Sequence, residues 1–231
     1  KIPANDQGGS LSCVGQAASY YAYVLNYLEL HRVYGCETAS RVAELSAKSV
    51  YSQIALASGG AHIREAVRLI CNYGINTEKD VPSYENKKVP SESFIKSSLW
   101  KTDKLSKKAE NYRGRSYRTV ISNSSIDLVA QAVKDNGGCI IGVSGENNGT
   151  WRSLRPRTPT RRAWGHAIYV GKFRLDPVTQ KKEIGILNSW NEETGEMGWQ
   201  WFGEEWFVGG WMSNVWTILD EHNIEKIILL D

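Results

Sequence analysis

The sequence has few cysteines, little net charge and no long apolar run, and each shortage argues against a class of protein. The four cysteines, at positions 13, 36, 71 and 139, include no Cys-x-x-Cys pair, so a zinc site is not expected. The net charge is only +3, so a general affinity for nucleic acid is not implied. No apolar run approaches the ~20 residues that a membrane-spanning helix needs, and no signal peptide is recognisable.

The cysteines also indicate the redox state. Cys71 and Cys139 lie in apolar runs and are expected in the core. If Cys13 is a nucleophile, three cysteines remain, an odd number that cannot all pair. We therefore expect a protein that does not depend on disulfides, with all four thiols free.

What is present indicates a folded protein with two unlike halves. Hydrophobic residues make up 41% and aromatic residues 10% of the chain, as in globular proteins. Apolar residues recur at helical spacing over 14–34, 41–57, 62–72 and 125–134, and 76–112 is a polar connection with short helical pieces. Ser40 is placed to cap the second of these helices. Short runs typical of strands follow at 139–143, 167–173, 183–187, 198–202, 215–219 and 226–230. Helices followed by strands predict an α+β fold.

The stretch from Gln7 to Cys13 is a candidate nucleophile site. Ser10 and Ser12 stand where a helix cap belongs, and Gly8-Gly9 permits a sharp reversal just before them. The positive end of the helix dipole would stabilise the Cys13 thiolate. The reversal would return the Gln7 amide to the sulfur, where it and the Cys13 N–H would form an oxyanion hole. A small buried cysteine is the plainer interpretation of Cys13.

Cys13 needs a base, and His166 is the best candidate. His31 and His62 fall on helical patterns and His222 lies near the end of the chain, whereas His166 opens a strand. Asn188 ends the next strand of the same hairpin, where its amide oxygen could accept the imidazole N–H. Trp190 could then keep water away from that bond.

The ordered set Gln7…Cys13, Gly165-His166-Ala167 and Asn188-Ser189-Trp190 resembles the papain family of cysteine peptidases, most closely its bacterial, archaeal and viral branch. Residues 58–66, 73–78, 81–84, 195–199 and 215–218 resemble further segments of that branch in the same order, so the resemblance covers about residues 5 to 219. It implies a papain-like α+β fold in one domain, 1–231. A helical lobe of about residues 8–115 would pack against an antiparallel, barrel-like β lobe of about residues 116–231, with the active site in the cleft between them.

The resemblance also implies roles for individual residues. Cys13 would be the nucleophile, His166 the acid/base, Asn188 the residue that orients the imidazole, and Gln7 the oxyanion donor. Gly59 and Gly60 would pair with the substrate backbone. The substrate-binding residues would be Gly59, Gly60, Ala61, His62, Trp164, Gly165, Ala167 and Trp190. Of these, Ala61, His62, Trp164 and Ala167 would face the main specificity pocket, and Trp164 would restrict it to small or medium apolar side chains.

Several departures from the family and several rival interpretations stay open. Ser10 replaces a cysteine that many members pair, and Leu11 stands where glycine is common and could narrow the cleft. Asp176, in a turn-forming Asp-Pro, is a rival for the third catalytic residue. Five arginines between 152 and 162 could grip an acidic partner or form a solvated loop. The tryptophans from Trp190 to Trp216 could stack on carbohydrate, although burial around the hairpin is the plainer role.

We therefore predict a cysteine endopeptidase that hydrolyses peptide bonds through a Cys-His-Asn triad and an acyl-enzyme, with no cofactor and no metal. Its partners would be a peptide or protein substrate, with a pro-segment or inhibitor in the cleft, and the protein would be a monomer. The alternatives are a papain-like cell-wall amidase or endopeptidase, and a non-catalytic peptide-binding virion or surface protein. The branch favours a prokaryotic or viral protein, cytoplasmic or virion-associated. Because the sequence begins at Lys1, secretion after removal of an upstream segment stays open.

Overall fold

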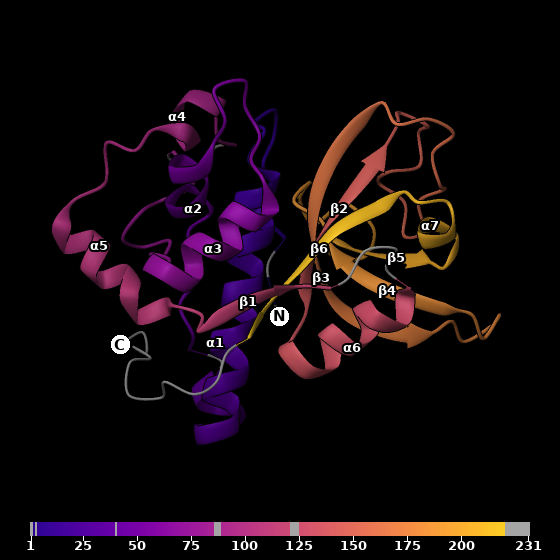
Figure 1. Ribbon diagram of the computed structural model, residues 1–231, viewed down its shortest axis with the longest axis horizontal. Helices are drawn as coiled ribbons and strands as arrows, with labels where there is room; N and C mark the ends of the chain where they lie inside the picture. Colours follow the sequence, from indigo (N-terminus) through magenta and orange to yellow (C-terminus); the bar gives the residue numbers. More distant parts are fainter. Residues whose placement is uncertain (1, 3, 40, 86–88, 121–124, 220–231) are drawn as a thin grey trace.

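The computed structural model describes residues 2, 4–39, 41–85, 89–120 and 125–219, and it places a group of helices beside a sheet (Figure 1). The helical elements are α1 (Cys13–Ala39), α2 (Ala47–Ile54), α3 (Ile63–Tyr73), α4 (Glu92–Lys96), α5 (Asp103–Ala109), η1 (Glu110–Tyr112), α6 (Ile126–Asn136) and α7 (Glu205–Val208). The strands are β1 (Ser116–Thr119), β2 (Cys139–Gly145), β3 (Trp164–Leu175), β4 (Lys182–Leu187), β5 (Trp199–Gly203) and β6 (Met212–Leu219).

The strands form one antiparallel sheet in the order β1-β6-β2-β3-β4-β5. The helices α1 to α5 gather on one side of the molecule, and α1 runs along the boundary with the sheet (Figure 1). The predicted α+β class is confirmed. Among the described strands, β1 and β5 remain as edges, so the sheet is not closed into a barrel.

The long helices follow the sequence pattern with two adjustments. The first helix begins at Cys13 as expected, and Gly35 (φ 81°) interrupts it where Tyr34-Gly35 was expected to end it. The predicted helix over 41–57 was too long, because residues 41–46 contain no helical turn and Leu45 bridges Thr77. The helix that follows starts at Ala47, where the Ser46 side chain accepts a bond from the Ser49 N–H. The expected cap, Ser40, lies outside the described residues.

Five of the predicted strands are present, and the sixth, 226–230, lies outside the described residues. Two elements escaped prediction. The strand β1 has only four residues, mostly exposed, and so lacks the apolar alternation of a half-buried strand. The helix α7 is a single turn of four residues. Neither is long enough to show a period.

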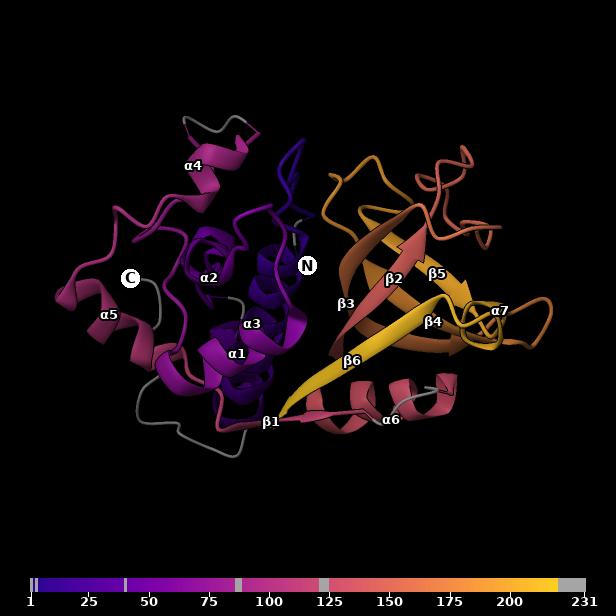
Figure 2. The ribbon, with the colours of Figure 1, turned by 45° about the horizontal axis from the view of Figure 1, so that its top comes forward.

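Two apolar clusters form the core, and the first joins the helices to the sheet. It combines α1, α2 and α3 with residues of four strands, namely Ile140, Tyr169, Leu187 and Ile218. Tyr21 of α1 stacks on Tyr169 of β3, with 5.6 Å between the ring centroids. The second cluster lies between the sheet and α6, which runs beneath the strands in Figure 2. The helical part and the sheet therefore share a core.

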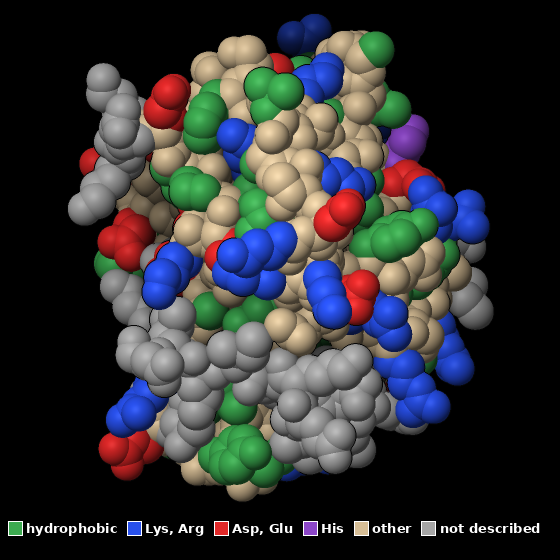
Figure 3. All heavy atoms as spheres, turned by 90° about the vertical axis from the view of Figure 1, so that its left-hand side faces the viewer, with side chains coloured by type: hydrophobic (Ala, Val, Ile, Leu, Met, Phe, Trp, Pro, Cys, Tyr) green, Lys and Arg blue, Asp and Glu red, His purple; other side chains and the backbone are tan. Residues whose placement is uncertain are grey.

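The surface of the helical part carries charges of both signs. Lys and Arg side chains are spread over the visible part of this face, with fewer Asp and Glu side chains among them (Figure 3). Within the described ranges, no helix combines the length and the apolar character needed to cross a membrane.

Candidate active site

Cys13 is the first residue of α1, and the turn before it is fixed by hydrogen bonds. Ser10 donates both its N–H (3.1 Å) and its Oγ–H (2.7 Å) to the carbonyl of Gln7. Gly8 adopts φ +55°, and a Cβ there would overlap Val89, so the turn requires glycine at this position. The carbonyl of Ser12 accepts the N–H of Gln16 (3.0 Å), which starts the helix. The sulfur is thereby placed at the helix N-terminus, as predicted.

The pKa of Cys13 moves in the direction opposite to the expectation. The backbone N–H groups of Ala167, Val14 and Cys13 favour the thiolate and lower its pKa. Burial of the thiol has a larger effect, and the pKa is raised above its ordinary value. The helix end therefore opposes the cost of burying a thiolate without overcoming it.

His166 and Asn188 meet as the sequence predicted. Nε2 of His166 and Oδ1 of Asn188 are 2.9 Å apart, and Asn188 is fully buried. Trp190 stacks on the imidazole at 4.8 Å and 22°, so it covers this bond from one side. Burial lowers the pKa of His166 to about 4, against the opposing effect of the Asn188 bond. The imidazole is accordingly neutral at physiological pH.

Gln7 is held rigidly beside the same hairpin. Its backbone N–H donates to the Ser189 carbonyl (2.9 Å), and its Oε1 accepts the Ser189 hydroxyl (2.5 Å). Its Nε2 donates to the Ser10 carbonyl (2.8 Å), which leaves the second N–H of that amide for another acceptor. Ser189 also donates its N–H to Oδ1 of Asn188 (2.8 Å). Ser189 thus links Gln7 to Asn188, a role that no local sequence pattern indicates.

A cleft of about 710 Å³ lies between the start of α3 and the strands β2, β3 and β6. Of the predicted residues, it is lined by Cys13, Gly59, Gly60, Ala61, His62, Gly165, His166 and Ala167. A larger cavity, about 790 Å³, lies between α2, α3 and α5 and contains none of them, so volume alone does not identify the site.

Trp164 and Trp190 lie beside His166. They are not among the residues that line this cleft. Trp164 packs against Trp151 (4.5 Å between centroids) and Trp190 (6.1 Å), and its Nε1 donates to Asn147 Oδ1. Along β3, Trp164 shares a face with His166 because side chains alternate. The two indoles therefore surround the imidazole instead of lining the pocket.

Gly59 and Gly60, the two glycines expected to pair with a substrate backbone, form a glycine ledge that is already hydrogen-bonded within the chain. The N–H of Gly60 donates to the Tyr51 hydroxyl (2.9 Å), and its carbonyl accepts from Leu56 (2.9 Å). Pairing of a substrate backbone with Gly60 would compete with both bonds. Tyr51 in turn donates to Glu92 (2.7 Å), whose other oxygen accepts the N–H of Leu11 (2.7 Å).

Leu11 borders this ledge from the other side. Its Cδ1 would lie 2.4 Å from a Cβ added at Gly59, so the side chain rests against that glycine. The side chain is half exposed. Leu11 thus reaches the glycine ledge, which agrees with the expectation that its side chain narrows the cleft.

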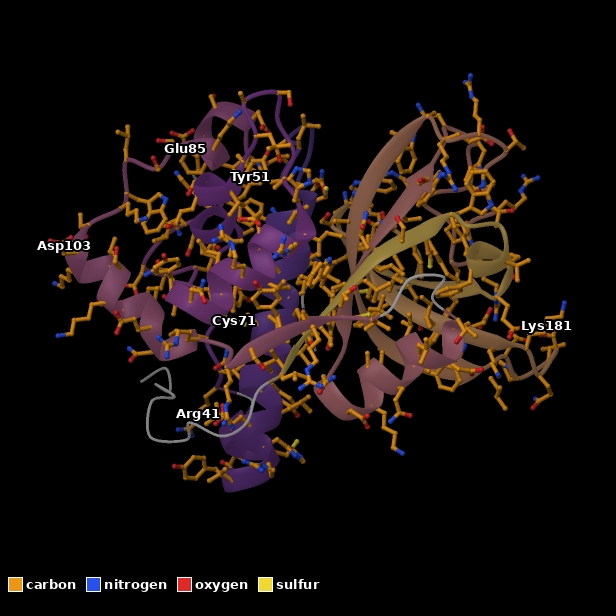
Figure 4. All side chains as sticks on the ribbon, viewed as in Figure 1. Arg41, Tyr51, Cys71, Glu85, Asp103 and Lys181 are labelled. Carbon is orange, nitrogen blue, oxygen red and sulfur yellow. The ribbon has the colours of Figure 1, made fainter. Side chains whose placement is uncertain are left out.

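Asp176 is not the partner of His166. Its Oδ1 accepts the N–H groups of Val178 (3.0 Å) and Thr179 (2.6 Å), and its Oδ2 pairs with Arg155. These bonds, with that from the Arg155 guanidinium, lower the pKa of the carboxyl, which the Thr179 N–H affects most. The turn that Asp176 closes reaches Lys181, at the end of the molecule remote from α1 to α5 (Figure 4). Asp176 therefore has the plainer, turn-forming role.

Most arginines between 152 and 162 are engaged within the protein. Arg155 also pairs with Glu183 (2.6 Å), Arg152 donates to the carbonyl of Trp190 (3.3 Å), and Arg162 donates to that of Gly210 (2.8 Å). The loop is thus attached to the hairpin and to the sheet by its own cations, which neither of the two earlier interpretations anticipated.

Of the tryptophans from Trp190 to Trp216, Trp206 is buried and the others are partly exposed. Trp151 and Trp206 are buried, and Lys172 and Arg174 cover the rings of Trp199 (3.8 Å) and Trp201 (3.6 Å). Covered rings argue against carbohydrate stacking at these positions. In the described part of the chain, no three His, Cys, Asp or Glu side chains are grouped to hold a metal ion. All four cysteines are described, and none forms a disulfide.

Comparison with known proteins identifies the fold. No protein-family model matches the sequence, and no curated protein sequence matches it. Among solved structures, xylellain, a cysteine protease from Xylella fastidiosa, superposes with a TM-score of 0.74 at 20% identity, over 96% of this chain and 84% of that one.

Two plant cysteine proteases, each in complex with E-64, are also similar. Bromelain from Ananas comosus gives a TM-score of 0.71 at 18% identity, over 95% of this chain and 94% of that one. The Carica candamarcensis protease CMS1MS2 gives 0.67 at 16% identity, over 96% and 94%. The chain has the fold of the papain-like cysteine proteases, as the motifs predicted.

Proposed function

We propose that this protein is a cysteine peptidase in which Cys13 is the nucleophile, His166 the proton carrier and Asn188 the residue that orients the imidazole. The observation that carries the proposal is the meeting of three separate motifs at one cleft. Cys13, His166 and Ala167 line the same cleft, the N–H of Ala167 lowers the pKa of the Cys13 thiol, and His166 bonds to Asn188. The fold of cysteine proteases, found independently of these residues, agrees with it. Residues 1–231 would act together as one peptidase domain.

The chemistry follows from the protonation states. A neutral imidazole accepts the Cys13 proton as the sulfur attacks the peptide carbonyl, and a tetrahedral oxyanion forms. The Cys13 N–H and the remaining N–H of Gln7 would bind that oxyanion. The protonated imidazole then gives its proton to the leaving amine, and a thioester remains on Cys13. Water, deprotonated by His166, hydrolyses the thioester and restores the thiol.

Cleavage of casein by the wild-type protein and by Cys13→Ala tests the proposal. The wild type should cleave, and Cys13→Ala should lose at least about a thousandfold in rate, since the nucleophile is absent. Cys36→Ala, which alters an exposed cysteine in α1, should keep the wild-type rate. Because two of the structural neighbours bind E-64, the same reagent should label Cys13 once and block cleavage.

The outcomes also separate the alternatives. Cleavage of peptidoglycan but not of casein would indicate a cell-wall amidase or endopeptidase. Binding of peptides without cleavage, and without labelling of Cys13, would indicate a non-catalytic protein. A pro-segment or a protein inhibitor would occupy the same cleft and would protect Cys13 from E-64.

A further inference from the structure

Gln200 of β5 is a fully buried amide behind the catalytic hairpin. Its Oε1 accepts a bond from Nδ2 of Asn188 at 2.9 Å. Its Nε2 donates to the carbonyls of Trp151 and Ser153, both at 2.7 Å. All hydrogens of this amide are therefore used, and all three partners lie within the site or in the loop beside it.

These bonds determine which way both amides point. Backbone carbonyls only accept hydrogen bonds, so the Gln200 atom that faces Trp151 and Ser153 must be the NH₂ group. The oxygen of Gln200 then faces Asn188 and requires a donor, which is Nδ2 of Asn188. The backbone N–H of Ser189, which only donates, requires Oδ1 of Asn188 on the opposite side. The two constraints agree.

The orientation of Asn188 decides where the imidazole carries its proton. Because Oδ1 faces Nε2 of His166 at 2.9 Å, that nitrogen must donate, and the neutral ring is the Nε2–H tautomer. Nδ1 is then left without a proton and can accept one. A reversed Asn188 would offer an NH₂ group to Nε2 and would move the ring proton to Nδ1, which would then be unable to act as a base.

We propose that Gln200 is a positioning residue that locks the orientation of Asn188 and, through it, keeps His166 in the tautomer that can accept a proton at Nδ1. The inference rests on the proposed function for its catalytic meaning, but the orientation itself does not depend on activity. The carbonyls of Trp151 and Ser153 determine the direction of the Gln200 amide, which in turn determines that of Asn188. Two other bonds hold that loop, from Trp201 N–H to the Leu154 carbonyl (2.8 Å) and from Gly195 N–H to the Arg152 carbonyl (2.9 Å), so the loop has anchors besides Gln200.

The tautomer can be measured directly in Cys13→Ala protein at pH 7. This background removes proteolysis, and the imidazole is neutral because its pKa is lowered to about 4. Imidazole ¹⁵N shifts, assigned with His166→Ala, should show a proton on Nε2 alone. Adding Gln200→Met, which has a similar length but no amide, leaves only the Ser189 N–H to orient Asn188 and should add a measurable population of the Nδ1–H tautomer. An unchanged single tautomer after this substitution would overturn the proposal.

Asn76→Leu is the matched control for a lost buried amide. Asn76 is buried in the helical part, where its Nδ2 donates to the Leu105 carbonyl (2.7 Å). This variant should lose stability without altering the His166 tautomer. A tautomer shift of equal size in Asn76→Leu would show that general destabilisation is the cause, and would refute a positioning role for Gln200.

Kinetics provide the second test. Gln200→Met should lower kcat by about tenfold with little change in KM, because substrate contacts are kept. In an Asn188→Ala background, the same substitution should have no further effect, because the residue through which Gln200 acts on the imidazole is already absent. Full additivity in the double variant would contradict the proposal. If the wild type cleaves no peptide, the proposed function fails, whereas the tautomer measurement still decides the role of Gln200.

Gln200→Glu covers the case in which the methionine variant does not fold. A protonated glutamic acid side chain can accept a hydrogen bond from Asn188 and donate one to the carbonyl of Trp151 or Ser153. An ionised side chain can donate to neither carbonyl. The ionised carboxylate is repelled by the carbonyls of Trp151 and Ser153 and can no longer hold Asn188 in a fixed position, so the ratio of its kcat to that of the wild type should fall as pH rises from 5 to 8. A ratio that stays constant over this range would count against Gln200.

Discussion

At the scale of single residues, Cys13 is subject to two opposed effects. Three backbone N–H groups around the sulfur lower its pKa, while burial raises it further than they lower it. A helix N-terminus is thus insufficient to predict a reactive thiolate, because the solvation of the sulfur also depends on the strands that line the cleft with it. The neutral His166 beside it calls for transfer of the thiol proton during the attack itself.

The pH dependence of alkylation checks this assignment. A raised pKa means that Cys13 keeps its proton to higher pH, so the thiolate fraction is small at pH 6 and grows through pH 9. Labelling of Cys13 by iodoacetamide, followed by mass spectrometry, should therefore be slow at pH 6 and should accelerate by at least about tenfold by pH 9. Fast labelling at pH 6 that disappears in His166→Ala would instead indicate a preformed thiolate–imidazolium pair.

At the scale of elements, α1 is attached to the sheet through the hydroxyl of Tyr21. This buried oxygen bonds to Thr217 Oγ1 (2.8 Å), to the Asn136 carbonyl (3.0 Å) and to both the carbonyl (3.1 Å) and the N–H (3.0 Å) of Ile218. The helix that begins at Cys13 is thereby fixed against β6. Tyr21 lies about two turns after Cys13, so this contact attaches the first half of α1 to the sheet.

Tyr21→Phe should therefore destabilise the protein without changing the cleft. Removing the hydroxyl leaves buried groups of β6 without their partner, at a cost of about 1–3 kcal/mol. Thermal unfolding should shift down by roughly 2–10 °C. Tyr27→Phe, in the same helix but facing the exposed Cys36, should stay within about 2 °C of the wild type. Equal shifts in the two variants would disprove the assigned role of Tyr21.

The loop that contains Trp151 is attached to the β3–β4 hairpin by Arg155. The guanidinium binds Glu183 and Asp176, both of which are buried, while Arg174 binds Glu183 from the other side (2.8 Å). Because the Arg155 cation lies between two carboxylates, its charge is compensated and it holds the arginine-rich loop against the hairpin. The loop carbonyls that orient Gln200 belong to this attached segment.

Limited proteolysis should detect the loss of this attachment. Arg155→Met removes the cation between the two carboxylates, so cleavage within residues 152–162 should accelerate by about twofold to fivefold. Arg157→Met provides the control, because its exposed side chain lies in the same loop. A similar acceleration in both variants would mean that any lost charge loosens the loop.

At the scale of the whole molecule, the helices and the sheet are joined by one of the two apolar clusters. Side chains from α1, α2 and α3 pack directly against strands of the sheet in this cluster. Neither part could separate without exposing it to water. The cleft therefore lies above a shared core, and its two walls should not unfold independently.

Two spectroscopic probes can test this cooperativity. Eight of the nine tryptophans lie between residues 151 and 216, so fluorescence follows the sheet part, whereas far-UV circular dichroism follows mainly the helices. In urea, the two transitions should coincide, as expected for a single cooperative unit. Midpoints that differ by more than about 0.5 M would show that the lobes unfold separately.

Much of the fold and of the candidate site could be predicted from local pattern. The helical period after Cys13 depends on burial of one face, and the short apolar run after His166 is typical of a buried strand, so the sequence displays both directly. The contact between His166 and Asn188 follows from strands that are neighbours in sequence, so their pairing needed no long-range information. The short strand β1 was missed because its four mostly exposed residues show no period, so only its pairing with the distant β6 identifies it.

The sequence by itself determined which residues meet: Cys13 at a helix start, and His166 bonded to Asn188. Only the tertiary structure decided their surroundings. Burial of the sulfur, the indoles of Trp164 and Trp190 around the imidazole, and the bonds of Gly60 all arise from segments distant in sequence. The same holds for Gln200, a polar residue whose partners come from Asn188 and from a loop about fifty residues earlier. Local pattern reports the faces of single elements, whereas solvation and hydrogen-bond direction depend on what packs against them.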